Sequence, residues 1–174
     1  MRMISAAAGL AAVLVAGCAS MGGPESRATA TLEPTKGNDA AGTVTFVQRD
    51  GQVLVTADVR GLKPNQDHGF HVHEKGDCSS GDGMSTGGHF NPDAVGHGHV
   101  LPGDTGHAGD MPNLKADASG NAKVSFSVTK MTVANGQFSI VGKGLIVHRD
   151  PDDFKSQPTG NAGPRMACAV IKPA

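Results

Sequence analysis

The histidines of this chain are arranged in one pattern. Two of them, His71 and His73, stand two residues apart in the sequence GFHVHE, which alternates like a β-strand. Side chains two positions apart on a strand point to the same face, so the two imidazoles can converge on one point. Further side chains that can bind a metal follow along the chain: His89, His97, His107, Asp110 and His148.

This set of side chains predicts a metal centre. It has too many imidazoles for one ion and too few cysteines for a thiolate site, so it indicates two adjacent ions, and imidazole suits copper and zinc. A single His-X-His pair is as often a surface feature, and a histidine-rich loop can be a weak metal-scavenging tract. Six of the eight histidines, however, fall in one ordered pattern with an aspartate, which chance clustering explains poorly.

The elements that position these side chains are predicted to be short β-strands. Asp50-Gly51 and Asn135-Gly136 are turn signals between β-branched runs, and no long helical periodicity appears. Roughly seven or eight short strands predict an all-β fold, an antiparallel sandwich or flattened barrel. The predicted strand segments are 27–34, 42–62, 67–74, 121–129, 131–150 and 166–171.

Two long loops interrupt the predicted strands. The first runs from Gly76 to about Ala116 and carries four of the possible ligands. A loop of this length in a compact domain is either disordered or functional, and its ligands together with Cys78 argue that it is ordered. The second loop, residues 150–165, precedes the last strand.

The N-terminus has the pattern of an export signal. Arg2 precedes an apolar stretch too short to span a membrane, which ends in Val15-Ala16-Gly17-Cys18. Small residues leading into a cysteine resemble a bacterial lipobox, in which Cys18 is lipidated and becomes the first mature residue. An ordinary signal peptide with a nearby cysteine is the alternative. We predict a lipoprotein signal peptide at 1–17, a flexible tether at 18–27 and one domain at 28–174.

This leader predicts a protein of the bacterial cell envelope that faces the periplasm. Residue 19 is alanine rather than aspartate, which in such lipoproteins usually implies the outer membrane. With Cys18 assigned to the lipid, Cys78 and Cys168 remain, and an even pair in an exported chain indicates a disulfide. The chain has 15 basic and 16 acidic residues without a basic cluster, so nucleic acid is not an expected partner. For the oligomeric state, the sequence is compatible with both a monomer and a homodimer.

Five segments together are similar to the copper/zinc superoxide dismutases. They are GFHVHEKGDC, GGHFNP, HAGD, LIVH and GNAGPRMACAV, and they occur in the order of that family. The resemblance runs from about Ala28 to the C-terminus. It implies an eight-stranded antiparallel Greek-key β-barrel or sandwich with two long functional loops. It also implies an enzyme that converts superoxide into oxygen and hydrogen peroxide.

The resemblance assigns the metal ligands. His89 is shared, as an imidazolate that bridges the two ions. Four nitrogens suit copper in both redox states, and three histidines with one aspartate form a closed shell for a structural zinc. His99 lies two residues after His97 and could compete for zinc, but the family's spacing favours His97. The implied ligands are His71, His73, His89 and His148 for copper, and His89, His97, His107 and Asp110 for zinc.

Other roles are implied in the same way. Asp152 is similar to a carboxylate that hydrogen-bonds a copper histidine and a zinc histidine, although Asp150 and Asp153 are close alternatives. Arg165 is similar to an arginine that attracts and orients the anion beside copper. His89 is both a copper ligand and the donor of a proton to the product.

Two other classes of function are considered. A metal-binding envelope protein on the same fold would store copper or zinc without turnover, and a structural lipoprotein would use the fold for interaction alone. Neither needs all the copper ligands together with Arg165, and this chain has them all. A Cys78–Cys168 bridge would tie the first long loop to the strand that carries Arg165. The sequence therefore predicts an exported, lipid-anchored copper/zinc superoxide dismutase.

Overall fold

The fold is described from a computed structural model, for residues 26–98 and 105–174. Within these ranges the protein is all-β, as predicted, and its one helical element is a 3-10 turn, η1 (Met84–Thr86). The strands are β1 (Arg27–Pro34), β2 (Ala41–Arg49), β3 (Gln52–Arg60), β4 (Asp67–His68), β5 (Phe70–His73), β6 (Leu114–Lys115), β7 (Ala122–Val128), β8 (Gly144–His148), β9 (Arg165–Val170) and β10 (Lys172–Pro173).

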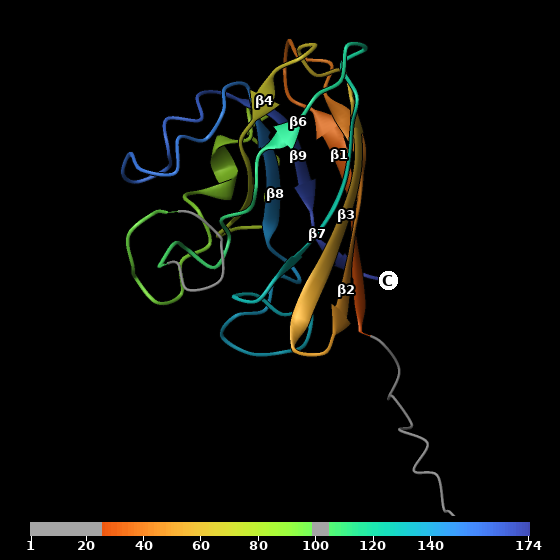
Figure 1. The fold of residues 1–174 in the computed structure, drawn as a ribbon. Coiled ribbons are helices and arrows are strands. Elements are labelled where there is room, and N and C mark those ends of the chain that lie inside the picture. The colour runs from red at the N-terminus through yellow and green to blue at the C-terminus, as the bar shows by residue number, and fades with distance from the viewer. Residues whose placement is uncertain (1–25, 99–104) are drawn as a thin grey trace, which may run out of the picture.

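Most strands form one curled antiparallel sheet (Figure 1). Its order is β5-β8-β9-β1-β2-β3-β7, and β10 lies beside β1. Strand β1 belongs to both halves of the curl, because residues 27–32 pair with β2 and residues 33–34 pair with β9. Neighbours that are distant in sequence, such as β3 with β7 and β5 with β8, give the sheet its Greek-key connections. The short pair β4–β6 stands apart from this sheet.

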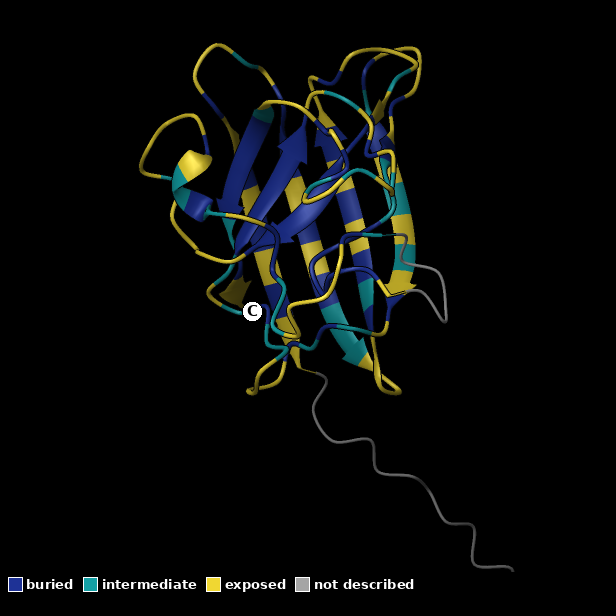
Figure 2. Cartoon of the chain, turned by 90° about the vertical axis from the view of Figure 1, so that its left-hand side faces the viewer, coloured by how far each residue is buried: buried dark blue, intermediate teal, exposed yellow. Residues whose placement is uncertain are grey.

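The concave side of the sheet holds the hydrophobic core. In β3, Val53, Val55, Ala57 and Val59 are buried, and the residues that alternate with them are exposed or half-buried. Leu32 of β1 and Phe46 of β2 continue the same face. Figure 2 shows the resulting alternation of buried and exposed bands along these strands. This is the period of two expected for a sheet with one face in the core and one in water.

The β2–β3 hairpin confirms the Asp50-Gly51 turn signal. Arg49 pairs with Gln52, and the two residues between them have φ of 48° and 77°. Two consecutive positive φ values define the type I′ turn, whose twist suits a tight hairpin.

Residues 131–143 differ from the prediction of strand structure. They form a loop on which Thr132 makes an isolated bridge. The side-chain oxygen of Gln48 accepts hydrogen bonds from Thr132 Oγ1 (2.7 Å) and Val133 N (3.0 Å), and the second bond removes Val133 N from any strand ladder. Val133 and Ile140 are buried in the core cluster. The segment therefore packs its apolar residues against the core instead of extending the sheet.

The described residues begin just before β1. The predicted signal peptide (1–17), Cys18 and His99 lie outside them. Arg27 pairs with Val47, so the strand begins one residue before the predicted domain boundary, within the predicted tether of 18–27. Among the described residues, no helix is long and apolar enough to cross a membrane.

Candidate metal centre

Strand β5 carries its two histidines on one face and two apolar residues on the other. Phe70 and Val72 enter the core, and all four residues of the strand are buried. His71 and His73 therefore lie on the same side of the strand, as the alternation of the sequence predicts.

The first long loop reaches β5 because it pairs with the free edge of that strand. Val72 N donates to Gly109 O (2.9 Å), and Val72 O accepts from Phe90 N (2.8 Å). Buried backbone groups need such partners, and here the loop supplies them. Gly109 permits the close approach, since a Cβ there would lie 2.2 Å from Val72 O. Isolated bridges on either side bring two loop residues to the strand histidines: Asp110 opposite His71 and His89 opposite His73.

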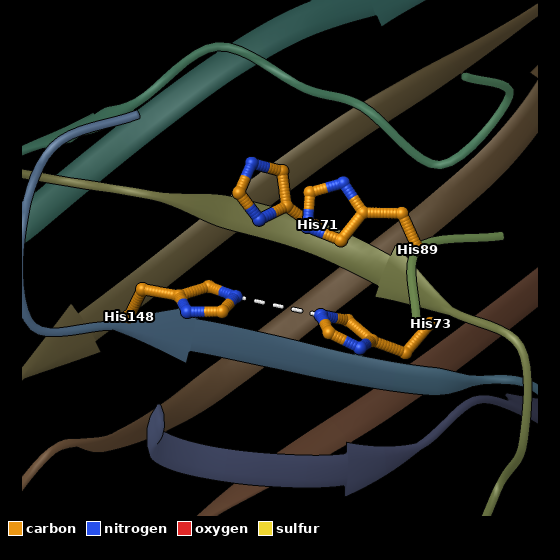
Figure 3. A group of neighbouring side chains, drawn as sticks. All are labelled: His71, His73, His89 and His148. Atoms are coloured by element: carbon orange, nitrogen blue, oxygen red, sulfur yellow. Dashed lines mark hydrogen bonds between the residues drawn. The ribbon is translucent and has the colours of Figure 1, made fainter. Parts of the chain in front are cut away.

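Four imidazoles converge beside β5 (Figure 3). One nitrogen of each lies within 4.8 Å of the others, and the group is His71, His73, His89 and His148. His148 enters from the end of β8, where the pairing with β9 shifts register after Val147. Irregularities of this kind re-aim a side chain near a functional site. The Nε2 atoms of His148 and His73 lie 3.4 Å apart. We call these four residues the first group.

Three members of the first group are held by a hydrogen bond on one ring nitrogen. The donors and acceptors are His71 Nε2 to Asp152 Oδ2 (2.8 Å), His73 Nδ1 to Gly87 O (3.0 Å) and His148 Nδ1 to Gly163 O (3.0 Å). Carbonyl and carboxylate oxygens only accept, so the opposite nitrogen of each ring keeps its lone pair. Ligand histidines in metal sites are oriented in this way.

A second group shares His89 with the first. Its four members, again with one atom each within 4.8 Å of the others, are His89, His97, His107 and Asp110. The Asp110 carboxylate is fully buried. It lies 2.8 Å from the Nδ1 atom of His89, 3.0 Å from that of His97 and 3.3 Å from that of His107. Because Nδ1 of His89 faces this group, its Nε2 remains for the first group.

Several buried ring nitrogens in the two groups have no hydrogen-bond partner in the protein. The short distance between His97 Nδ1 and Asp110 is not an aligned hydrogen bond, so that nitrogen is among them. An unpaired buried polar atom costs about 1–3 kcal/mol, and bound metal ions would remove this cost. Four imidazoles suit copper, and three with one carboxylate suit zinc, so the residues fit two metal ions. The atoms are His71 Nδ1 and His89 Nε2 in the first group, and His97 Nδ1 and His107 Nδ1 in the second.

The carboxylate of Asp152 joins the two groups. Its Oδ2 accepts from His71 Nε2 (2.8 Å), and its Oδ1 accepts from His97 Nε2 (2.9 Å). The alternatives lie elsewhere: Asp150 bonds to Arg149, and Asp153 bonds to Ser156 and Asn161. Of the three aspartates, Asp152 is therefore the one that contacts histidines of both groups.

Burial keeps three histidines of the first group uncharged, namely His73, His89 and His148. It lowers the pKa of His73 and His148, and the neighbouring imidazoles and Arg165 lower them further. Burial also lowers the pKa of His89 to about 4. These nitrogens are neutral at pH 7 and can bind a cation without first losing an extra proton.

In the second group, by contrast, the surroundings favour charged side chains. Burial disfavours the charge of His97, but the Asp110 carboxylate beside its Nδ1 and the hydrogen bond from its Nε2 to Asp152 outweigh burial and raise the pKa of His97 to about 9. Burial would raise the pKa of Asp110, whereas the three imidazoles around its carboxylate hold that pKa far below its usual range. A metal ion that binds here at pH 7 must therefore displace a proton from His97.

Arg165 begins β9 and lies beside the first group. Its Nη1 donates to Gly83 O (2.6 Å) and Thr86 Oγ1 (2.8 Å), and its Nη2 donates to Gly87 O (2.7 Å). Its charge lowers the pKa of two histidines of the first group. An arginine side chain remains charged throughout the physiological range, so it places a fixed positive charge next to the imidazoles.

The predicted disulfide is confirmed. Cys78 and Cys168 are bonded, with their Cα atoms 6.0 Å apart and a sequence separation of 90. Closure of a loop of this length stabilises the fold by about 4–5 kcal/mol in the chain-entropy relation. Cys168 shares β9 with Arg165, and Cys78 precedes η1. The bridge thus ties the turn that contacts the guanidinium to the strand that carries it.

Three residues around the centre are missed by the sequence analysis: Thr86, Gly87 and Gln157. Gln157 Oε1 accepts from His97 N (2.8 Å), and its Nε2 donates to His97 O (2.8 Å). No local pattern marks Thr86 or Gln157, because their partners lie 79 and 60 residues away in sequence. Gly87 carried a signal, since paired glycines just before a ligand histidine indicate a special backbone conformation.

His68 lies next to the first group without belonging to it. It is fully buried, and its Nδ1 donates to His148 O (2.9 Å). It thereby holds the main chain at the end of β8.

Comparisons with known proteins point to one family. The model of the family described as "Copper/zinc superoxide dismutase (SODC)" matches residues 40–171. Superoxide dismutase (Cu-Zn) 2 of Aquifex aeolicus (strain VF5) is 40% identical over 150 residues, which cover 84% of this chain and 86% of that protein. The superoxide dismutase (Cu-Zn) of Paramecium bursaria Chlorella virus 1 is 44% identical over 136 residues, covering 75% and 71%. The crystal structure of the clock protein EA4 superposes with a TM-score of 0.75 at 40% identity, covering 85% of this chain and 94% of that one.

Proposed function

Because the chain belongs to the copper/zinc superoxide dismutase family, we propose that its two histidine groups are the copper and zinc sites of that enzyme. The protein is an enzyme that dismutates superoxide, with copper and zinc as cofactors. The proposed ligands are His71, His73, His89 and His148 for copper, and His89, His97, His107 and Asp110 for zinc. The observation that supports this assignment is that these two groups contain four buried ring nitrogens without a hydrogen-bond partner in the protein.

The reaction joins two half-reactions. One superoxide ion loses an electron and leaves as oxygen, and a second gains an electron and two protons and leaves as hydrogen peroxide. Copper held by the first group would supply the change of oxidation state that links the two half-reactions, and zinc held by the second group would supply a fixed positive charge beside His89. The positive charge of Arg165 attracts the anion. The guanidinium N–H groups that make no hydrogen bond to the protein then orient it.

The chain's own residues maintain the geometry throughout. His71 and His97 are each held in one tautomer by Asp152, so neither ring turns between half-reactions. His89 Nε2 is buried without a protein partner, so this atom can hold one proton and pass it to the product. Little has to move for catalysis, since the charged and polar groups are already placed.

A metal-storage protein without turnover finds no support. The relatives from Aquifex aeolicus and the Chlorella virus are named as dismutases. In addition, three hydrogen bonds fix the guanidinium of Arg165 beside the first group, an arrangement that metal storage does not need.

Metal content and superoxide dismutation, measured on the same purified sample, test the proposal. We expect about one copper and one zinc per chain, and activity that disappears when copper is removed and returns when it is added back. Full metal binding without turnover would favour the storage protein. Absence of paired metal binding would contradict the proposed sites.

We also propose that the protein is exported and anchored in the outer membrane through a lipid on Cys18. Support comes from the sequence Val15-Ala16-Gly17-Cys18 with Ala19 after it, and from the disulfide, which persists in an oxidising compartment. Such a protein would act on superoxide outside the cytoplasm, because the anion crosses membranes poorly. Cys18→Ser should move the protein from the membrane fraction to the soluble fraction. A variant that still sediments with membranes would contradict the anchor.

A further inference from the structure

Thr86 is a buried polar residue that completes the surroundings of the Arg165 guanidinium. Its side chain is inaccessible to solvent. Its Oγ1 accepts a hydrogen bond from Arg165 Nη1 (2.8 Å) and donates its own proton to Gly83 O (2.8 Å). The same Gly83 oxygen accepts a second bond from Arg165 Nη1, at 2.6 Å. Thr86, Gly83 and the Nη1 amino group thus form a closed ring of hydrogen bonds.

This ring determines how the guanidinium can turn. Nη1 donates to Gly83 O and to Thr86 Oγ1, and Nη2 donates to Gly87 O. All three acceptors belong to the short turn Gly83–Gly87, so they approach the planar group from one side. A guanidinium is planar, so these three contacts fix its orientation, and the N–H groups that they do not use remain available to an anion.

The hydroxyl of Thr86 cannot swing away from this position. A Cβ added at Gly144 of β8 would lie 2.8 Å from Thr86 Cγ2, which shows how closely the threonine packs on that strand. The main-chain oxygen of Thr86 accepts from Lys75 N (3.0 Å). Packing and backbone pairing thus fix the residue, and it in turn fixes Arg165.

We propose that Thr86 is a positioning residue for anion binding by Arg165. This inference rests on the proposed function and adds a residue to it. Gly83 and Gly87 contribute only main-chain oxygens, whereas the bond from Thr86 depends on its side chain. Without the hydroxyl, Arg165 keeps its charge but loses one of the two bonds that orient Nη1. Superoxide would still be attracted to the site, and it would be bound in the wrong orientation more often.

The test compares two variants of the copper- and zinc-loaded protein. Thr86→Val keeps the shape and removes the hydroxyl, and Thr86→Ser keeps the hydroxyl and removes the methyl group. We expect Thr86→Val to lower both the dismutation rate constant and the affinity for azide, a small anion that reports on the site without turnover, by about tenfold. Thr86→Ser should recover most of both losses. Unchanged azide affinity and rate in Thr86→Val would overturn the proposal.

A double-mutant cycle with Arg165→Lys separates positioning from a general effect on folding. Lysine keeps the charge but has no planar fork to orient, so Thr86→Val should have almost no further effect in that background. An equal loss in both backgrounds would show that Thr86 acts through folding alone and would overturn the proposal. If Thr86→Val does not fold, Thr86→Ala compared with Thr86→Ser isolates the hydroxyl in the same way. Azide binding also tests the inference separately from the proposed function. A protein that does not turn over superoxide can still lose azide affinity in Thr86→Val.

Discussion

The guanidinium of Arg165 and the imidazole of His73 hydrogen-bond to one oxygen. The carbonyl of Gly87 lies 2.7 Å from Arg165 Nη2 and 3.0 Å from His73 Nδ1. The anion-binding residue and a proposed copper ligand are therefore oriented by the same peptide. Gly87 has φ 75° and ψ −152°, a region that is open almost only to glycine. A Cβ there would also lie 2.8 Å from the carboxylate of Glu74.

Gly87→Ala should damage copper binding and catalysis together. The backbone cannot keep its conformation with a Cβ, so the carbonyl turns and both hydrogen bonds weaken. We expect the copper affinity and the rate per bound copper each to fall by roughly tenfold, measured by chelator competition and by a dismutation assay. Gly81→Ala is the matched control, because Gly81 also has φ 75° but has open space around its Cβ position. Equal effects of the two variants would show that the shared carbonyl is not the cause.

His148→Ala should separate the two metals. It removes one of four proposed copper ligands and none of the proposed zinc ligands, so dismutation should fall to background while about one zinc per chain is retained. His107→Ala is the converse variant and should release zinc first. Elemental analysis after dialysis against a weak chelator measures both. Loss of zinc from His148→Ala would show that the ligands are divided wrongly between the two groups.

The elements that could be predicted are those with local signals. The alternation in residues 67–74 predicted that His71 and His73 share a face, and Asp50-Gly51 predicted the β2–β3 turn, because both signals depend only on neighbours in sequence. The strand structure predicted for 131–143 is wrong because a local signal does not include partners that are distant in sequence. The competing partner of that segment is Gln48, which lies 84 residues before Thr132.

The metal groups show a similar limit. The resemblance assigned the ligands, but the local sequence could not show how the first long loop comes to lie beside β5. Main-chain hydrogen bonds of Val72 to Gly109 and Phe90 hold the loop against β5. Such bonds do not depend on side-chain type, so the sequence carries no signal for them. Thr86 and Gln157 were missed because one threonine or glutamine in a loop is ordinarily a solvated residue. Only the folded chain shows that Thr86 is buried and that both amide atoms of Gln157 are used.

Gln157 should slow the loss of zinc. Its amide both accepts from and donates to the main chain of His97, and so ties the second long loop to a proposed zinc ligand. Gln157→Ala removes both bonds, and Gln157→Glu keeps the acceptor but sets an oxygen against His97 O. Each should raise the zinc dissociation rate by roughly three- to tenfold, measured with a chromogenic chelator. Gln137→Glu is a control with the same charge change, because Gln137 makes one long bond (3.3 Å) to Pro92 in the first long loop. Equal zinc dissociation rates in all the variants would show that the bonds between Gln157 and His97 do not retain zinc.

The metal-free protein should be most stable near neutral pH, because the histidines have pKa values shifted in both directions. Burial holds the pKa of His89 at about 4 and lowers those of His73 and His148, against an ordinary value of 6.5. Between those values the unfolded chain binds more protons than the folded one, so stability is lost as pH falls below 6.5. The pKa of His97 is raised to about 9. Its contribution is complete below 6.5 and is lost as pH rises through 9.

Thermal unfolding of the metal-free protein between pH 4.5 and 9.5 measures this profile. We expect the melting temperature to fall by several degrees on both sides of the maximum, since about 1 kcal/mol corresponds to roughly 2–4 °C in a chain of this size. His97→Gln should flatten the alkaline side and leave the acidic side in place. Bound copper and zinc should flatten both sides near neutral pH, because metal ions then occupy the nitrogens that would otherwise bind protons. A melting temperature that rises steadily from pH 5 to 9 in the metal-free protein would show that the Asp110 and Asp152 carboxylates do not hold a charged His97.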